Sequence, residues 1–207
     1  MLSVGERGQI RTFDCSENPP FVSWEYSFDT ASFTHVLCLT DSVFAVSDGS
    51  IFRFSSAKGK SIWSQHHLFP SPLDGASYSL LFVPDHDSLI IATQQRVGCL
   101  SASTGRILWS TQLNSNFPVV SLACFSEGYS SSFLGFAGKV LSLDLITGHV
   151  LWETATAGDI VTLVCVPCGP GQPPLVVAGC DGQLFVLDPD IGARLHQHNL
   201  SSMMTTA

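Results

Sequence analysis

Two cysteines with metal-ligand spacing occur in the segment Cys165-Val166-Pro167-Cys168. Two thiolates at this spacing can share a zinc ion or form a disulfide, and the pKa of the first thiol can be lowered. A zinc site needs four ligands, and the sequence has no second C-x-x-C pair to supply the others. Because the pair ends an apolar run instead of opening a helix, its spacing favours a strand cysteine followed by a loop cysteine. Cys180 is then a candidate neighbour of Cys165 on the adjacent strand.

Histidines form two further groups that could bind a metal ion, His66-His67 and His196-x-His198. Residues i and i+2 of a strand share a face, so His196 and His198 are expected on one side. The segment Asp85-His86-Asp87 is predicted to form a solvated turn between strands, and no G-x-S-x-G nucleophile elbow accompanies it. We therefore predict no catalytic, cofactor-binding or metal-binding residues, and no enzymatic activity.

The elements that must position these side chains come from an internal repeat of about 44 residues. Each copy has an apolar strand, which reads Gly-x-Leu-x-x-Leu-Asp in the fourth copy (Gly182–Asp188), then a turn with glycine, then an outer strand. Three copies place the tryptophan at Trp63, Trp109 and Trp152, and in the fourth copy His196 takes that position. The simplest role for the repeated tryptophan is packing between adjacent repeats.

Short strands separated by turn residues make up each copy. In the third copy we expect strands over Val119–Cys124, Phe133–Phe136, Lys139–Asp144 and His149–Glu153. Hairpins are predicted at Asp48-Gly49, Ala137-Gly138 and Asp181-Gly182. A type I′ turn requires positive φ at both central residues, and Asp-Gly is among the pairs that favour it. Four strands in about 44 residues are typical of a β-propeller blade.

The predicted fold is therefore all-β, a propeller of four-stranded antiparallel blades. An N-terminal half-blade over 8–27 and four blades that start near 35, 78, 119 and 160 give about 4.5 blades. The propeller arc is expected to span 1–198, with a disordered tail over 199–207. Since propellers usually have about 4–8 blades, we expect an incomplete ring that is completed by missing blades or by a protein partner. The open edges also predict self-association.

Composition restricts the function. The net charge of −8, with only 13% charged residues, argues against a nucleic-acid partner, which requires a basic surface. No apolar run is long enough to span a membrane. The seven cysteines are odd in number and irregularly spaced, and no signal peptide is evident, so a cytoplasmic location is predicted.

The repeat resembles the pyrroloquinoline-quinone-type propeller repeat, through Gly138–Trp152 and Val97–Trp109 and, more loosely, Gly49–Trp63 and Gly182–His196. Members include quinoprotein dehydrogenases, a bacterial outer-membrane assembly lipoprotein and a propeller subunit of an endoplasmic-reticulum membrane complex. The strand Ser132–Gly138, followed by Thr147–Trp152, is most similar to the C-terminal propeller of beta-alanine-activating, adenylate-forming enzymes. An active quinoprotein would imply a quinone stacked on a tryptophan, a calcium ion and a Cys-Cys pair, which this sequence lacks.

We therefore expect a non-catalytic scaffold or protein-interaction module without a cofactor, part of a larger protein of the beta-alanine-activating type. A quinoprotein-type dehydrogenase and a propeller subunit of the endoplasmic-reticulum membrane complex are the alternatives.

Overall fold

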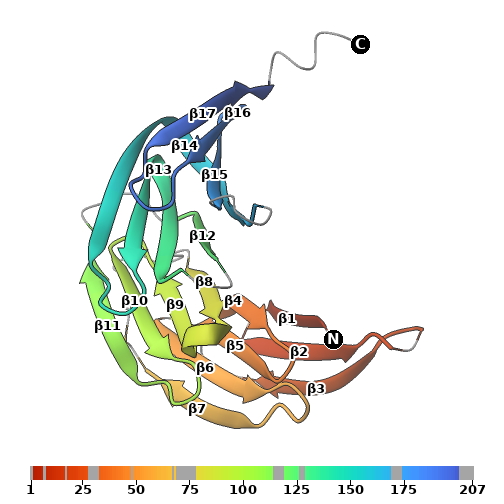
Figure 1. Cartoon of the computed structure of the whole chain (residues 1–207). Coiled ribbons are helices and arrows are strands. Elements are labelled where there is room, and N and C mark those ends of the chain that lie inside the picture. Colours follow the sequence, from red (N-terminus) through yellow and green to blue (C-terminus); the bar gives the residue numbers. More distant parts are fainter. Residues whose placement is uncertain are drawn as a thin grey trace.

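The structure is a computed structural model and describes residues 2–6, 8–16, 18–27, 33–47, 49–66, 68, 78–113, 119–125, 129–168 and 174–200, without the side chains of 2–6 and 34. Antiparallel sheets follow one another along an open arc, with the two ends of the chain on either side of its gap (Figure 1). The predicted all-β propeller fold is confirmed, and the ring is not closed. We number the blades 1 to 5 along the chain and call the interface between consecutive blades a seam.

Blades 2 and 3 are separate four-stranded sheets in which sequential strands are neighbours. Blade 2 consists of β4 (Phe33–Cys38), β5 (Ser42–Ser47), β6 (Ser50–Ser55) and β7 (Ser61–Gln65). Blade 3 consists of β8 (Ser79–Val83), β9 (Ser88–Ala92), β10 (Arg96–Ser101) and β11 (Ile107–Gln112), with a short 3-10 helix, η1 (Pro84–His86), between β8 and β9.

Blades 4 and 5 form one continuous six-stranded sheet, because two of its strands are long. It contains β12 (Ser121–Cys124), β13 (Ser131–Asp144), β14 (Val150–Val166), β15 (Leu175–Cys180), β16 (Gln183–Leu187) and β17 (Arg194–Asn199). The two ends of β13 lie side by side, since the Leu145 amide donates to the Ser130 carbonyl at 2.7 Å. β14 passes from the outer strand of blade 4, which pairs with β13, to the inner strand of blade 5, which pairs with β15.

Blade 1 has three strands, one more than the half-blade predicted over 8–27. β2 (Gln9–Asp14) and β3 (Phe21–Ser27) match the two predicted strands, and β1 (Leu2–Glu6) precedes them. β1 pairs with β2 across a two-residue turn, as β5 pairs with β6, so β1 corresponds to the second strand of a complete blade. Among the described residues, blade 1 therefore lacks only the innermost strand.

Turn glycines adopt the conformation that the hairpins require. Gly138 and Gly182 have φ of 77° and 74°, and Asp181 also has positive φ, 38°, so Asp181-Gly182 has the positive φ angles of a type I′ turn. At Ala137-Gly138 only the glycine has positive φ. Asp48 lies outside the described residues.

The apolar core lies in the seams and not within single sheets. Each of the four clusters of buried side chains joins neighbouring blades: for example, Trp109 of β11 packs with Leu134 and Leu143 of β13. A propeller blade buries its two faces only against neighbours, so each cluster stabilises two blades at once.

β17 extends to Asn199, and the Leu200 amide donates to the Gly182 carbonyl at 2.7 Å. Asn199 and Leu200, which were expected in a disordered tail over 199–207, are therefore ordered, and 201–207 lie outside the described residues. In the described part of the chain, no helix has the length and apolar character that a membrane crossing requires.

Candidate functional site: the seams and the two free faces of the arc

Every tryptophan of the chain lies in a seam, on the outer strand of one blade and against the glycine turn of the next. An added Cβ on Gly59, Gly105 or Gly192 would lie 2.5 to 2.7 Å from the facing indole, and one on Gly148 would also clash with its indole. Only glycine leaves room for the ring at these turns. The four contacts pair Trp24 with Gly59, Trp63 with Gly105, Trp109 with Gly148 and Trp152 with Gly192.

Each indole nitrogen also donates a hydrogen bond to a carbonyl of the facing turn. The acceptors are Ser56 at 2.6 Å for Trp24, Ala102 at 2.9 Å for Trp63, Leu145 at 2.7 Å for Trp109 and Pro189 at 2.8 Å for Trp152. A buried indole needs such a partner, and the bond fixes the ring orientation. The predicted packing role of the repeated tryptophan is therefore seen in all four seams.

These contacts decide whether a tryptophan is available to stack on the quinone that the repeat family implies. The chain has four tryptophans, and each has one ring face on a glycine and its nitrogen bonded to backbone. Among the described residues no group of three or more His, Cys, Asp or Glu side chains is arranged to hold a metal ion. The residues present do not fit the tryptophan-stacked quinone and its calcium ion.

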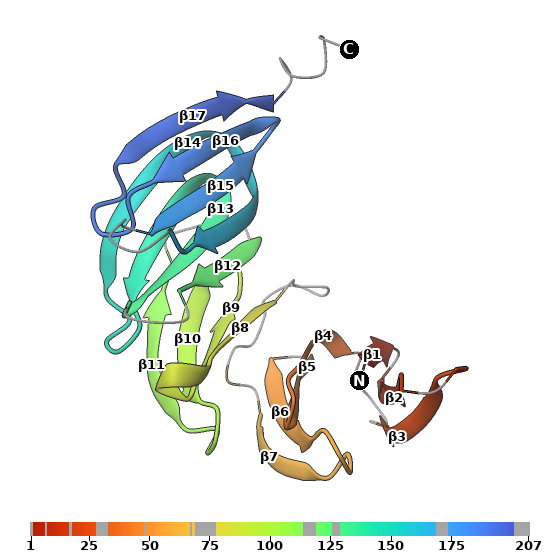
Figure 2. The ribbon, with the colours of Figure 1, turned by 45° about the vertical axis from the view of Figure 1, so that its right-hand side comes forward.

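The outward face of blade 5 repeats the composition of a seam without a covering blade. A row of directly paired residues crosses its four strands, from Val164 through Val177 and Val186 to His196. The corresponding row of blade 4, which ends in Trp152, is covered by blade 5: Ala123, Phe133 and Trp152 all belong to the buried cluster shared with it. Val164 is 49% exposed. We call the row Val164–Val177–Val186–His196 the terminal face, which lies at the free end of the arc (Figure 2).

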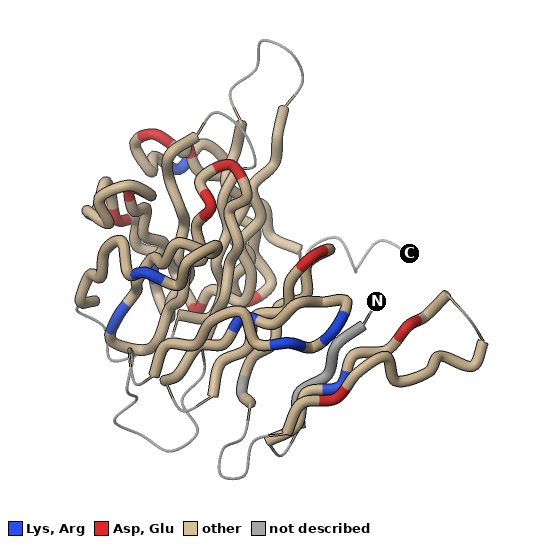
Figure 3. The backbone as a smooth tube through the Cα atoms, turned by 90° about the horizontal axis from the view of Figure 1, so that it is seen from below, with Lys and Arg blue, Asp and Glu red and all other residues tan. Residues whose placement is uncertain are grey.

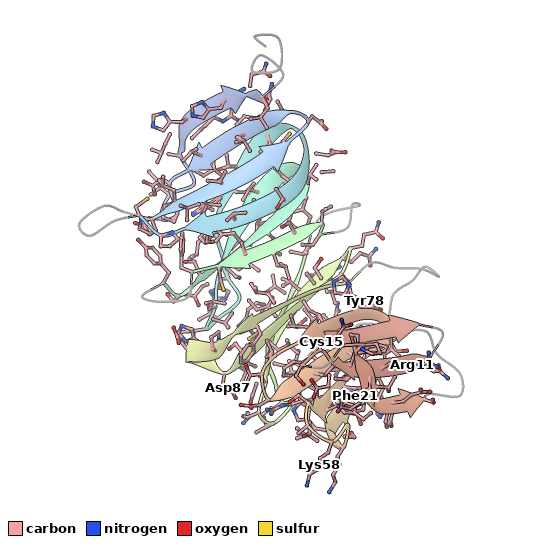
Figure 4. All side chains as sticks on the ribbon, turned by 90° about the vertical axis from the view of Figure 1, so that its right-hand side faces the viewer. Arg11, Cys15, Phe21, Lys58, Tyr78 and Asp87 are labelled. Atoms are coloured by element: carbon pink, nitrogen blue, oxygen red, sulfur yellow. The ribbon has the colours of Figure 1, made fainter. Side chains whose placement is uncertain are left out.

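The free face of blade 1 differs in chemistry. Arg11 and Glu25 are paired across β2 and β3, and their Nε and Oε2 atoms form a salt bridge of 2.9 Å. Arg11 also donates to Gln9 at 3.0 Å. The connection between β2 and β3 contains no glycine, so this blade lacks the residue that receives a tryptophan in the other four. Figure 4 shows Arg11 and Phe21 on this blade, at the end opposite β17.

Charged side chains do not gather into a basic strip. Lys and Arg are dispersed along the arc in Figure 3. The described part of the chain has two Lys/Arg–carboxylate pairs, Arg11–Glu25 and Lys139–Glu153.

The structure separates the cysteines that sequence reasoning placed together. Cys165 pairs with Val176, whereas Cys180 pairs with Ile160 at the other end of β15, so the expected adjacency of Cys165 and Cys180 on paired strands is wrong. Burial, and secondarily the proximity of Cys124, raise the pKa of the Cys165 thiol to about 12. All seven cysteines are free thiols. Cys165 is an inert seam residue, not an activated nucleophile.

His196 and His198 lie on β17 with ring centroids 6.4 Å apart, on one face as predicted. His66 accepts from or donates to Ser64 at 3.1 Å and packs edge-on against Phe52, and His67 lies outside the described residues. The segment 85–87 forms the expected exposed turn between β8 and β9.

Asp87 in that turn is a structural acceptor. Its carboxylate accepts hydrogen bonds from the Ser101 hydroxyl at 2.9 Å and the Ser103 amide at 3.0 Å. Burial would raise the pKa of Asp87, but the bonds from Ser103 and Ser101 and the charge of Arg53 outweigh it, so the pKa is lowered. Arg53 is a polar seam residue that the repeat pattern alone does not single out.

Comparisons with known proteins agree with this architecture. The family described as outer membrane protein assembly factor BamB matches residues 22–123 and 47–207. An uncharacterized protein of Rickettsia prowazekii (strain Madrid E) is 27% identical over 145 residues, which are 64% of this chain and 33% of that protein. The chain thus spans about a third of the length of this curated relative.

Solved structures show the same fold at low identity. BamB from Moraxella catarrhalis superposes with a TM-score of 0.68 at 14% identity, over 95% of this chain and 60% of that chain. Saccharomyces cerevisiae Sqt1 gives 0.75 at 13% identity, over 95% and 58%. A europium-containing methanol dehydrogenase gives 0.72 at 13% identity, over 95% and 49%.

The arc therefore corresponds to about half to three-fifths of each of these longer chains. Together with the matched residues and the seam geometry, this places the chain in a family: it belongs to the PQQ-type propeller-repeat family described as outer membrane protein assembly factor BamB.

Proposed function

We propose that this chain is a non-catalytic interaction scaffold, an arc of a larger propeller whose terminal face binds a further blade. The observation that carries the proposal is the row Val164–Val177–Val186–His196, which occupies the positions that are covered at every internal seam. The further blade can belong to the same polypeptide or to a partner protein.

The geometry of the two free faces supports a docking partner other than the chain's own first blade. An internal seam needs a tryptophan on one side and a glycine turn on the other. The terminal face presents His196 in place of the tryptophan, and the turn of blade 1 has no glycine. The apolar terminal face would also meet the Arg11–Glu25 pair, whose charges would lose water without gaining a new partner.

Self-association of the isolated chain tests the proposal, because two exposed terminal faces can pack against one another when the further blade is absent. We expect light scattering after size-exclusion chromatography to give a mass that rises with concentration above 22.2 kDa. Val164→Glu should restore the monomer by placing a charge on the terminal face. Val22→Glu is the matched control, since Val22 is 46% exposed on the opposite blade and Val164 is 49% exposed.

A monodisperse monomer at all concentrations would contradict the proposal, as would equal loss of association in both variants. Thermal unfolding of each variant separates lost association from lost folding, because substitution of an exposed valine leaves the unfolding temperature of the monomer nearly unchanged.

A finer proposal concerns the parent protein, for which we favour an adenylate-forming enzyme of the beta-alanine-activating type in the cytoplasm. It rests on the resemblance of 132–152 to the propeller of those enzymes. An antibody against this chain should then detect a longer cytosolic polypeptide with an adenylation domain. Detection in a membrane complex of the endoplasmic reticulum, protected from protease in microsomes, would favour the alternative parent.

A further inference from the structure

Arg53 breaks the pattern of the seam rows. It lies on β6, directly paired with Phe44 on β5 and Trp63 on β7, in the row that faces blade 3. The equivalent row positions of the other blades hold the uncharged residues Thr12, Cys99, Ser142 and Val186. Four blades build this position without a charge, so packing alone does not require an arginine there.

The guanidinium group is held in place on two sides. Its Nε donates to the Ser42 hydroxyl at 2.9 Å, and its Nη1 donates to the carbonyls of Ala102 and Ser103 at 3.0 and 3.2 Å. Its carbon Cζ lies 5.7 Å from the centre of the Phe44 ring. The third nitrogen, Nη2, has no hydrogen-bond acceptor, and no carboxylate lies within 4.0 Å of Arg53, among the described residues.

A pocket of about 840 Å³ lies beside this group, between blades 2 and 3. Arg53 lines it together with the apolar side chains of Leu39, Phe82 and Pro84. Phe82 stacks on Phe44 with ring centroids 6.2 Å apart, and the Arg53 guanidinium also lies over the Phe44 ring. Phe44 therefore supports both the apolar wall and the guanidinium.

The rim of the pocket is anchored by backbone bonds. The Ser56 amide donates to the Asp41 carbonyl at 3.2 Å, and its hydroxyl donates to the Thr40 carbonyl at 2.7 Å. The Leu39 amide donates to the Ser42 carbonyl at 2.8 Å. These bonds fix the loop between β4 and β5, so the pocket is preformed, as most small-ligand sites are.

We propose that this pocket binds a peptide segment of a partner protein, with one carboxylate on Arg53 and an adjacent apolar side chain against Leu39, Phe82 and Pro84. A guanidinium with a free nitrogen pairs with a carboxylate through charge-assisted hydrogen bonds. The apolar wall buries the neighbouring side chain of the peptide and so adds hydrophobic binding energy to that of the charge pair.

The local charges select a single carboxylate over a phosphate. Within the described part of the chain, Arg53 is the one cationic side chain that lines the pocket, and the exposed Asp41 on its rim carries the opposite sign. The Asp87 carboxylate, which accepts from Ser101 and Ser103, lies in the turn that contains the pocket residue Pro84. A doubly charged phosphate would meet these acids with only one cation to balance it, and the chain as a whole has a net charge of −8.

Cys38 gives a direct probe, because its exposed thiol lines the pocket, whereas Cys15 is exposed on blade 1. The rate of alkylation of each thiol by iodoacetamide is followed by peptide mass spectrometry on the whole chain. N-acetyl-Phe-Glu-amide, at about 10 mM, should slow alkylation of Cys38 about threefold, as expected for a Kd of about 5 mM. Cys15 should be unaffected, and N-acetyl-Phe-Gln-amide should protect neither thiol.

Two variants test whether the charges of Arg53 and Asp41 cause the protection of Cys38. Arg53→Met, which keeps the apolar stem, should abolish the difference between the Glu and Gln peptides. Asp41→Asn should increase protection by the Glu peptide about twofold, because it removes a like charge from the rim. The Asp41 variant keeps the test valid if loss of the Arg53 hydrogen bonds prevents folding.

Equal protection by the Glu and Gln peptides would overturn the proposal and leave a purely apolar pocket. Protection by inorganic phosphate as strong as that by the Glu peptide would overturn it in favour of a general anion site. No protection of Cys38 by the Glu peptide, with Cys15 and the fold intact, would overturn it outright. None of these results depends on the terminal face, so the pocket and the proposed scaffold function are tested separately.

Discussion

Blade 4 and blade 5 present the same sheet face to different surroundings. In blade 4 the row ends in Trp152, which is 9% exposed, contacts Gly192 and donates to the Pro189 carbonyl. In blade 5 the row ends in His196, on a strand whose six residues are all exposed. The strands, turns and register are alike, and only the covering blade differs.

This comparison shows that the neighbouring blade, and not the strand itself, determines the residue type at the end of the row. A tryptophan is retained where a glycine turn receives it. Where no such turn faces the row, among the described residues, the position holds a polar side chain, while the three valines of the row remain. The terminal face thus keeps the valines of an apolar seam row but has a histidine where an internal seam has a tryptophan.

The largest expected effect on stability comes from truncating Trp152, the row residue that blade 5 covers. Trp152→Ala should lower the free energy of unfolding by about 3–5 kcal/mol, because it deletes a buried aromatic side chain and leaves a cavity. His196→Ala is the matched control at the same repeat position, and should change stability by less than about 0.5 kcal/mol. Urea denaturation measures both. Similar losses in the two variants would show that blade 5 is covered in solution.

The rate of thiol alkylation should differ widely between the covered and free sides. Cys165 packs into the seam, and its pKa of about 12 leaves almost no thiolate at pH 8. Cys15, which is exposed, should therefore be alkylated at least about 100-fold faster at that pH. Combining the assay with Trp152→Ala sharpens the comparison, since an opened seam should accelerate alkylation of Cys165 and leave that of Cys15 unchanged.

Alanine substitutions at two glycines distinguish the cost of backbone strain from the cost of a clash in the seam. Gly182 and Gly192 have φ of 74° and 68°, so alanine costs about 1–2 kcal/mol at either position. An added Cβ meets nothing within 4 Å at Gly182 but lies 2.5 Å from the Trp152 ring at Gly192. Gly192→Ala should therefore be the more destabilising variant, by about 1–3 kcal/mol. Equal unfolding midpoints in urea would mean that Trp152 moves aside freely.

The smallest effect is expected at the other free face. Arg11 and Glu25 are 49% and 38% exposed, so Arg11→Ala should cost less than about 1 kcal/mol, and raising the salt concentration should reduce this cost further. Thermal unfolding at low and high salt measures it. A loss of several kcal/mol would indicate that blade 1 is buried against another surface.

The repeat can be recognised in the sequence because its two constraints are visible as residue types. Glycines at the turns and tryptophans at constant spacing predict the hairpins and the seams, and the turn glycines do adopt positive φ. β1 is not predicted, because Leu2–Glu6 carries only two large apolar residues, too few to mark a strand.

Other features depend on strand pairing that residue types do not reveal. Val166 pairs with Leu175 beside the β14–β15 connection, so Cys165 lies near that connection, whereas Cys180 ends β15 at the turn into β16. The antiparallel pairing therefore places the two cysteines at opposite ends of β15. Arg53 stands between two phenylalanines, and alternation alone predicts a side chain in solvent. Alignment of the seam rows identifies it, because the equivalent positions are uncharged.

The tryptophan contacts also determine the order in which the seams can form during synthesis. Each indole finds its carbonyl partner 32 to 39 residues further along the chain, never earlier. During synthesis at about 5–20 residues per second, a finished blade therefore waits roughly 2–8 seconds for the turn that covers its tryptophan. Every emerging blade completes its predecessor and leaves its own outer face open, so the growing chain always has one unfinished end on which a chaperone could act.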